Sequence, residues 1–191
     1  LSTLFEMTVE AHSKENAITF KKLVGKPASL KLTYKDDVER DFAGVVGEVR
    51  QGITDDETGF THYTFKIYPT FWIATFNQDY KIYQNKSASD IIEEVLGENG
   101  VDMFTNKGAP KGKAVRKYCV RYGESAYDFC ARLMAEEGIF YYFTMSDDGD
   151  MLQLSGGVSN LTPIKGSVEL KFMPANTSTP WGNTIQELYL E

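Results

Sequence analysis

The first 70 residues alternate between apolar and polar side chains with the period of a β-strand. In the segment Phe5–Val9 the apolar residues fall two apart, so one face is expected to meet a core and the other water. The same alternation returns at Leu30–Tyr34 and at Tyr63–Tyr68. Pro69 is expected to end the last of these strands, because it has no amide hydrogen to give to a sheet.

A further strand, Phe42–Val49, is interrupted by Gly44 and Gly47, and this spacing suggests a bulge or the corner of a barrel. The polar stretch Thr54–Gly59 follows and carries three acidic residues. Because alternating segments lie on both sides of it, the stretch is predicted to be the turn of an antiparallel β-hairpin.

The middle of the chain changes to helical spacing. Ser87 and Asp90 have the spacing of a capping box, with Asp in place of the usual Glu, so a helix is predicted to begin there. The apolar residues that follow are three and four apart and would share one face: Ile91, Ile92, Val95 and Leu96. Gly97 or Gly100 can end this helix.

A second helix is predicted from the N-cap pattern of Ser125 with Asp128, and Gly138 suits its carboxyl end. The residues expected on its apolar stripe are Ala126, Phe129, Cys130, Leu133 and Met134. Burial of this stripe should contribute about 1.5–3 kcal/mol for each large side chain.

Strands are predicted around these helices. Tyr118–Tyr122 alternates, Ile139–Phe143 is a short apolar run, and Met151–Leu154 returns after the turn Asp147–Gly149. Gly108–Lys113 is rich in Gly and Pro and is expected to be a loop. The predicted order in this region is therefore helix, strand, helix, hairpin.

The segment from Leu161 onward contains three of the 6 prolines and is predicted to be loop-rich, with short strands around Val168–Phe172 and Ile185–Leu190. Changes of pattern near Asn77–Lys81 and near Asp150 suggest domain boundaries. The predicted fold class is α+β and β-rich. Residues 1–77 and 151–191 would form a split antiparallel β-barrel, and residues 78–150 an inserted α+β subdomain.

Composition narrows the possible partners. The formal net charge is −7, and no cluster of Lys and Arg offsets it, so nucleic acid is not an expected partner. The longest apolar run, Ile139–Phe143, is far below the roughly 20 residues of a membrane span. The stretch Leu1–Glu10 contains Glu6 and Glu10 and does not have the pattern of a signal peptide.

The chain has two histidines and two cysteines, yet their spacing does not predict a metal site. His12 is expected in a turn and His62 in a strand, with no second ligand nearby in sequence. Cys119 and Cys130 are predicted to be buried thiols, and a buried thiol reacts poorly. No metal ligand, cofactor or catalytic Cys–His pair is therefore predicted.

Paired carboxylates could indicate a glycosidase, which uses two. Glu136–Glu137 and Glu93–Glu94 are adjacent on helices, so the members of each pair point about 100° apart. Asp55–Glu57 lies on an expected exposed turn, and Ser146–Asp150 lacks the ligand spacing of a calcium loop. No catalytic residue is predicted. Two alternatives stay open, a cell-wall glycosidase and a carbohydrate-binding β module that uses exposed aromatic residues such as Tyr80, Tyr83 and Tyr127.

One region carries a specific resemblance. It comprises Tyr118–Ser125, Asp128-Phe129, Arg132-Leu133, Glu136–Ile139 and Tyr141–Phe143. This string resembles the signature of the Vgr family, the trimeric spike hubs of type VI secretion systems, which are related to the baseplate hubs of contractile phages. Other pieces resemble the family in the same order: Phe42–Val46, Tyr63–Pro69 with Trp72, and Lys81–Gln84 followed by Ser87, Asp90, Ile91 and Ile92. The chain departs from the family pattern at Lys81, Arg121 and Ala126, where the family usually has Arg, Gln and an acidic residue.

The resemblance implies a phage-tail-hub-like fold and a structural role, without enzyme activity. It implies a homotrimer on the secretion tube that carries effector or spike domains, assembled in the bacterial cytoplasm and then secreted. The chain would be the amino-terminal part of such a hub. Within the signature, Glu124 and Asp128 would favour the amino-terminal end of the second helix, and Arg132 is placed for an i,i+4 pair with Asp128.

Overall fold

The computed structural model describes residues 1–34, 38–107, 114–146, 148–161, 171–172 and 184–185. Residues 1–160 form one compact unit, and residues 161–191 belong to a second. In the second unit β10 (Lys171–Phe172) pairs in parallel with β11 (Thr184–Ile185), so strand structure is confirmed at these four positions. The rest of the two strands predicted there, and the loop Gly108–Lys113, lie outside the described residues.

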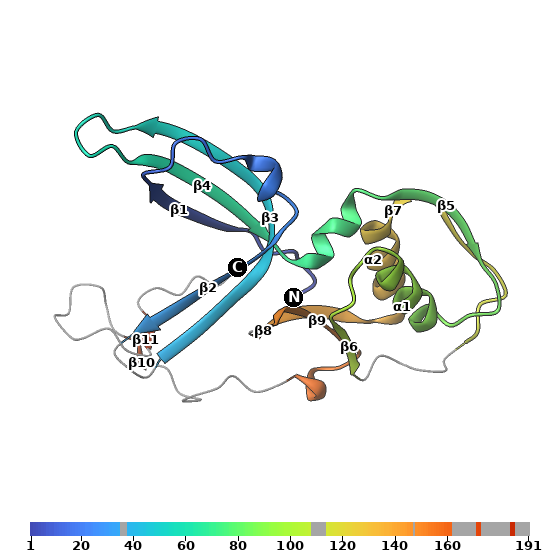
Figure 1. Ribbon diagram of the computed structural model, residues 1–191. Coiled ribbons are helices and arrows are strands. Elements are labelled where there is room, and N and C mark those ends of the chain that lie inside the picture. The colour runs from blue at the N-terminus through green and yellow to red at the C-terminus, as the bar shows by residue number, and fades with distance from the viewer. Residues whose placement is uncertain (35–37, 108–113, 147, 162–170, 173–183, 186–191) are drawn as a thin grey trace. The chain divides into compact units, whose positions relative to one another are not determined.

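The amino-terminal strands form one antiparallel sheet with the order β1-β4-β3-β2 (Figure 1). Its members are β1 (Met7–Ser13), β2 (Pro27–Tyr34), β3 (Val38–Thr54) and β4 (Thr61–Tyr68). The short 3-10 helix η1 (Phe20–Lys22) lies between β1 and β2. The predicted strands and the acidic hairpin turn are confirmed, and so is the fold class. The sheet is open within the described residues, however, and does not close into the expected barrel.

The two glycines of β3 lie where this long strand changes partner. Its first half pairs with β2 and its second half with β4, and the pairing slips between Val46 and Glu48, which confirms a bulge at Gly47. A Cβ atom at Gly44 would overlap the carbonyl oxygen of Tyr68, and one at Gly47 would meet the ring of the same tyrosine. Close approach to β4 therefore requires glycine at both positions.

The following region combines two α-helices and two short 3-10 helices with two small sheets. The helices are η2 (Thr70–Thr75), α1 (Ala88–Glu98), α2 (Ala126–Glu137) and η3 (Val158–Asn160). The strands are β5 (Gln78–Tyr83), β6 (Phe104–Lys107), β7 (Cys119–Ser125), β8 (Phe140–Ser146) and β9 (Gly149–Ser155). β5 pairs with β7, and the other sheet has the order β6-β9-β8. The predicted helix, strand, helix and hairpin are confirmed as α1, β7, α2 and β8–β9, but β6, which lies between α1 and β7, was not predicted.

The helices begin and end as the sequence predicts. Ser87 and Asp90 form a reciprocal capping box, and Ser125 accepts a hydrogen bond from the backbone N–H of Asp128 at 2.9 Å. Gly138 adopts the left-handed conformation that ends α2. At α1 the positive φ belongs to Gly100, whereas Gly97 lies inside the helix.

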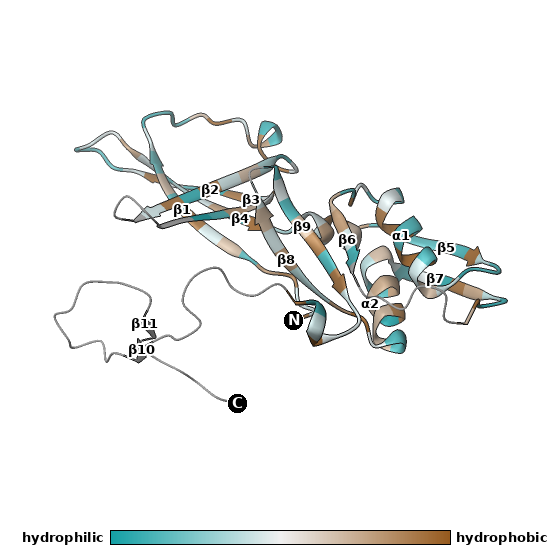
Figure 2. Ribbon diagram, turned by 90° about the horizontal axis from the view of Figure 1, so that it is seen from below, coloured by the Kyte–Doolittle hydropathy of each residue, from teal (hydrophilic) through white to brown (hydrophobic). Residues whose placement is uncertain are grey.

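A single apolar cluster joins the helices to the sheet β6-β9-β8 (Figure 2). The predicted faces of both helices are buried in it, together with Tyr141, Leu152 and Leu154. No helix in the described part of the chain is long and apolar enough to cross a membrane.

The amino-terminal sheet is in direct contact with the sheet β6-β9-β8, because β3 lies against β8 and β9. Contacts of the residues before and after the amino-terminal sheet add to this. Asp150, at the start of β9, is buried and accepts hydrogen bonds from the backbone N–H and the hydroxyl of Thr70 at 2.8 and 2.6 Å. Phe5 packs edge-on against Phe143 with ring centroids 5.3 Å apart. The boundary suggested near Asp150 falls inside the β8–β9 hairpin, so the division into residues 1–77 with 151–191 and residues 78–150 stays a prediction.

Candidate functional site

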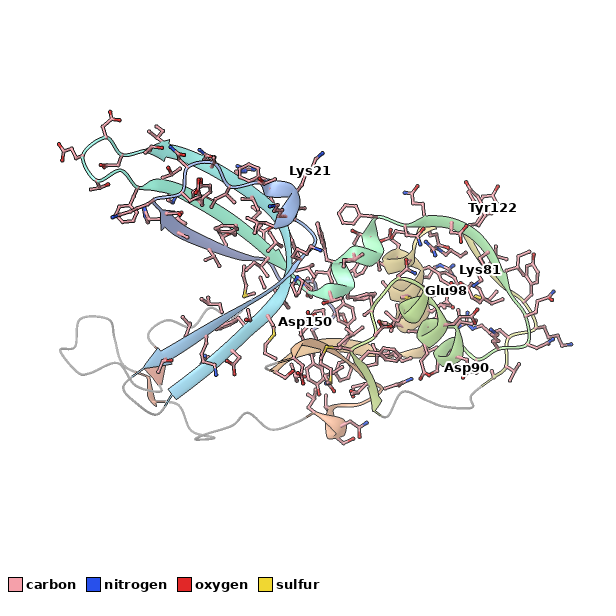
Figure 3. All side chains as sticks on the ribbon, viewed as in Figure 1. Lys21, Lys81, Asp90, Glu98, Tyr122 and Asp150 are labelled. Atoms are coloured by element: carbon pink, nitrogen blue, oxygen red, sulfur yellow. The ribbon has the colours of Figure 1, made fainter. Side chains whose placement is uncertain are left out.

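The signature region folds into a two-stranded ribbon with helices on one side. The face of β7 that carries Cys119 and Arg121 is buried, as is Tyr83 on β5. The opposite face is exposed, and Figure 3 shows Tyr122 pointing away from α1 and α2. The alternation predicted at Tyr118–Tyr122 is therefore real, but its aromatic side faces solvent.

Arg121 is the largest fully buried side chain in the described residues. Its Nε donates to the carbonyl oxygen of Glu124 at 3.0 Å, and its Nη2 donates to the carbonyl oxygen of Asn77. The backbone N–H of Ala126 reaches the same Asn77 oxygen at 3.0 Å. Arg121 thus ties the segment before β5 to the start of α2, and it binds backbone oxygens instead of an exposed partner.

A chain of ion pairs covers the outer side of α2. Arg132 contacts Glu124 at 2.6 Å and Glu136 at 3.2 Å, and Arg116 contacts Glu136 at 2.6 Å and Glu137 at 2.7 Å. The predicted pair of Arg132 with Asp128 is wrong. The carboxylate of Asp128 turns back to accept from the hydroxyl of Ser125, which leaves the earlier Glu124 within reach of the guanidinium.

The same arrangement recurs on α1. Lys81 bonds to Glu94 and Glu98, and Lys86 also bonds to Glu94; Figure 3 shows Lys81 and Glu98 facing each other. The hydrogen bond that Lys81 donates to Glu98 is the main cause of the rise in the pKa of Lys81 to about 12. The pKa of Glu94 is lowered, mainly by Lys86. The carboxylate of Glu94 is therefore held by two cations and carries no proton to donate at neutral pH.

Two glutamates of the ion-pair chain on α2, Glu124 and Glu136, have lowered pKa values. A general acid needs a raised pKa, but hydrogen bonds from Arg132 and Arg116 lower the pKa values of Glu124 and Glu136, respectively. Ser146–Asp150 forms the turn region of the β8–β9 hairpin, although position 147 is outside the described residues. The carboxylate of Asp150 accepts two hydrogen bonds from Thr70, as described above.

The three tyrosines considered as a sugar platform do not share a surface. Tyr80 is exposed, whereas Tyr83 is buried against Phe129, with ring centroids 5.5 Å apart. Tyr127 is half-buried and its hydroxyl bonds to that of Tyr141 at 3.0 Å. The exposed aromatic pair is instead Tyr80 with Tyr122, at 5.0 Å and nearly perpendicular.

The cysteines and His62 lie where predicted, but His12 does not. Both thiols are buried, and desolvation raises the pKa of Cys130 to about 12. His12 lies in β1 rather than in a turn, directly opposite His62 on β4. The two histidines are far apart in the sequence but adjacent in the fold, so the expectation that each stands alone is wrong. No group of three or more His, Cys, Asp or Glu in the described ranges is arranged to hold a metal ion.

The ion pairs of Arg132 predict a pH dependence of stability. Because the folded-state pKa of Glu124 lies below the ordinary value of 4.5, the unfolded chain takes up the proton first. The stabilisation is therefore complete above pH 4.5 and is lost as the pH falls towards the folded-state pKa. Arg132→Met should lower the free energy of unfolding at pH 7 by about 1 kcal/mol, since these pairs are partly exposed.

Urea unfolding at pH 7 and pH 3.5 checks this. Arg132→Met should lose less stability between the two pH values than the parent chain does. Lys117→Met removes the same charge from an exposed position and serves as control. An equal pH-dependent loss in the parent and in Arg132→Met would contradict the assignment.

Comparison with solved structures identifies the fold as that of tail and spike hubs. The Escherichia coli c3393 protein, described as a component of the type VI secretion system with similarity to T4 tail proteins gp27 and gp5, superposes with a TM-score of 0.74 at 19% identity. The match covers 92% of this chain and 46% of that protein. A chain of the half-lidded Francisella PdpA–VgrG complex matches with a TM-score of 0.63 at 12% identity, over 88% of this chain and 28% of that one.

The chain belongs to the phage tail baseplate hub (GPD) family, whose model matches residues 1–190. The type VI secretion system spike protein VgrG1b of Pseudomonas aeruginosa is 34% identical over 151 residues, and VgrG1c of the same organism is 34% identical over 155. These alignments cover 79% and 81% of this chain but 20% and 21% of the relatives. The resemblance seen in the signature region is confirmed, and the chain spans about a fifth of the length of these curated relatives.

One of the relatives is named as a toxin. The actin cross-linking toxin VgrG1 of Vibrio cholerae is 28% identical over 160 residues, which are 84% of this chain and 14% of that protein. So small a share of the toxin gives no ground for assigning its activity to this chain.

Proposed function

We propose that this chain is a structural domain of a type VI secretion spike hub and not an enzyme. The observation that carries the proposal is the family match along residues 1–190, with spike proteins among the relatives. The ion-pair chains on α1 and α2 support it, because the carboxylates that could have served as catalytic acids hold the fold together instead.

The hub would assemble as a homotrimer on the tube of the secretion machine and carry effector or spike domains. It would be put together in the bacterial cytoplasm and then secreted. The exposed face of the β5–β7 ribbon supports a role in protein contacts. Four large side chains here are more than half exposed: Tyr80, Ile82, Tyr118 and Tyr122. Exposed apolar side chains that lie close together are typical of surfaces that bind other proteins.

Light scattering on the complete protein tests the proposal. We expect the mass of three chains, and a strict monomer at high concentration would contradict the trimer. Tyr80→Ser with Tyr122→Ser, which leaves the buried face unchanged, shows whether this ribbon makes the contact. If the double variant stays trimeric, the contact lies on another surface.

The enzyme alternative is tested separately. Peptidoglycan is incubated with the parent chain and with Glu124→Gln and Glu137→Gln. We expect no turnover in any of the three. Hydrolysis by the parent that either substitution abolishes would overturn the structural assignment.

A further inference from the structure

The two histidines of the chain meet across a pair of antiparallel strands. His12 on β1 and His62 on β4 are direct partners in the register, one position from the end of the pairing at Ser13 and Thr61. Among the strands that the structure describes, β1 is the outermost of its sheet, so this pair lies at an edge. Both side chains reach solvent, His12 being exposed and the side chain of His62 being 36% exposed.

The spacing of the two rings fits a shared metal ion. Their centroids are 5.1 Å apart and their planes are inclined by 47°. An imidazole nitrogen lies about 2.0–2.1 Å from Zn²⁺, so two imidazoles on one tetrahedral ion have ring centres roughly 5 Å apart. The register of β1 and β4 therefore places the rings at the separation that chelation requires.

The charge around the pair also favours a cation. Glu10 lies on the same exposed face of β1, two residues before His12, and its Oε2 is 3.9 Å from Nε2 of His62. On the other side His62 faces Gly52, where a Cβ atom would come within 3.2 Å of Nδ1. Nε2 of His62 is thus the nitrogen beside a carboxylate of β1.

We propose that His12 and His62 bind one divalent transition-metal ion of the Zn²⁺ class through two imidazole nitrogens. Water completes the coordination, and the carboxylate of Glu10 contributes negative charge beside the ion. Imidazole nitrogen is a preferred ligand of such metals. The bound ion would link the carboxyl end of β1 to β4. The spacing of the two histidines along the sequence matches no metal-binding motif.

Calorimetric titration of tag-free, chelator-treated complete protein with Zn²⁺ tests the site. We expect one ion per chain. His12→Gln and His62→Gln should each weaken binding about tenfold or more, because one imidazole cannot chelate alone, and Glu10→Gln should weaken it less. Thr8→Gln, on the exposed face of the same strand, is the control and should leave binding unchanged.

Thermal unfolding gives a second readout. Zn²⁺ should raise the unfolding midpoint of the parent and of Thr8→Gln, and should not raise that of either histidine variant. If His62→Gln fails to fold, the exposed His12→Gln still decides. Absence of Zn²⁺ binding by the parent, or binding that neither histidine substitution weakens, overturns the proposal.

Discussion

Replacing Gly44 with alanine is expected to lower the free energy of unfolding by about 3 kcal/mol. The added Cβ atom would overlap the carbonyl oxygen of Tyr68 and lie 3.0 Å from Cγ2 of Ile67. A backbone carbonyl cannot turn aside as a flexible side chain can. The end of β4 must therefore move away from β3 at the point where β3 passes from β2 to β4.

Gly97→Ala is the matched control for this substitution. Gly97 lies inside α1, and a Cβ atom there meets nothing within 4 Å. The same chemical change should stabilise the chain by up to about 1 kcal/mol, because alanine is the better helix former. Urea unfolding measures both variants. A Gly44→Ala chain as stable as the parent would show that β3 and β4 do not approach each other so closely.

Local sequence patterns predicted the starts and ends of the helices well, because these features depend on residues that are close together in the sequence. The Ser-x-x-Asp pattern places the starts of both helices, since the capping hydrogen bonds join residues three apart at Ser87 and Ser125. Gly138 ends α2 for a similar reason, because its left-handed conformation is a local property. The two glycines of β3 predicted either a bulge or the corner of a barrel, and the register shift at Gly47 shows that the first alternative is correct.

What the sequence could not show is which distant segments meet. His12 and His62 are 50 positions apart, and only the register of β1 with β4 brings them together. The partner of Arg132 was mispredicted because i,i+4 spacing is the default expectation on a helix. In the folded chain Glu124, outside the helix, lies closer to the guanidinium. The open edge of the amino-terminal sheet is likewise a property of strand order, which alternation does not specify.

Replacing Arg121 with methionine is expected to lower the free energy of unfolding by about 3 kcal/mol. The side chain is 1% exposed and donates to the backbone oxygens of Asn77 and Glu124. Methionine fills a similar volume but gives no hydrogen bond. The Glu124 oxygen loses this donor, and the Asn77 oxygen keeps only the N–H of Ala126. Each buried polar group left unpaired costs about 1–3 kcal/mol.

Arg121→Gln separates hydrogen bonding from charge. The Vgr resemblance gives glutamine as the usual residue at this position, and its amide can still donate to one of the two oxygens, so about 1 kcal/mol should be lost. Tyr122→Met, on the exposed face of the same strand, should change stability by less than about 0.5 kcal/mol. Burying a guanidinium is itself costly. If Arg121→Met is as stable as the parent, the free-energy cost of burying the guanidinium offsets the gain from its hydrogen bonds. Arg121 then does not stabilise the junction between β5 and α2.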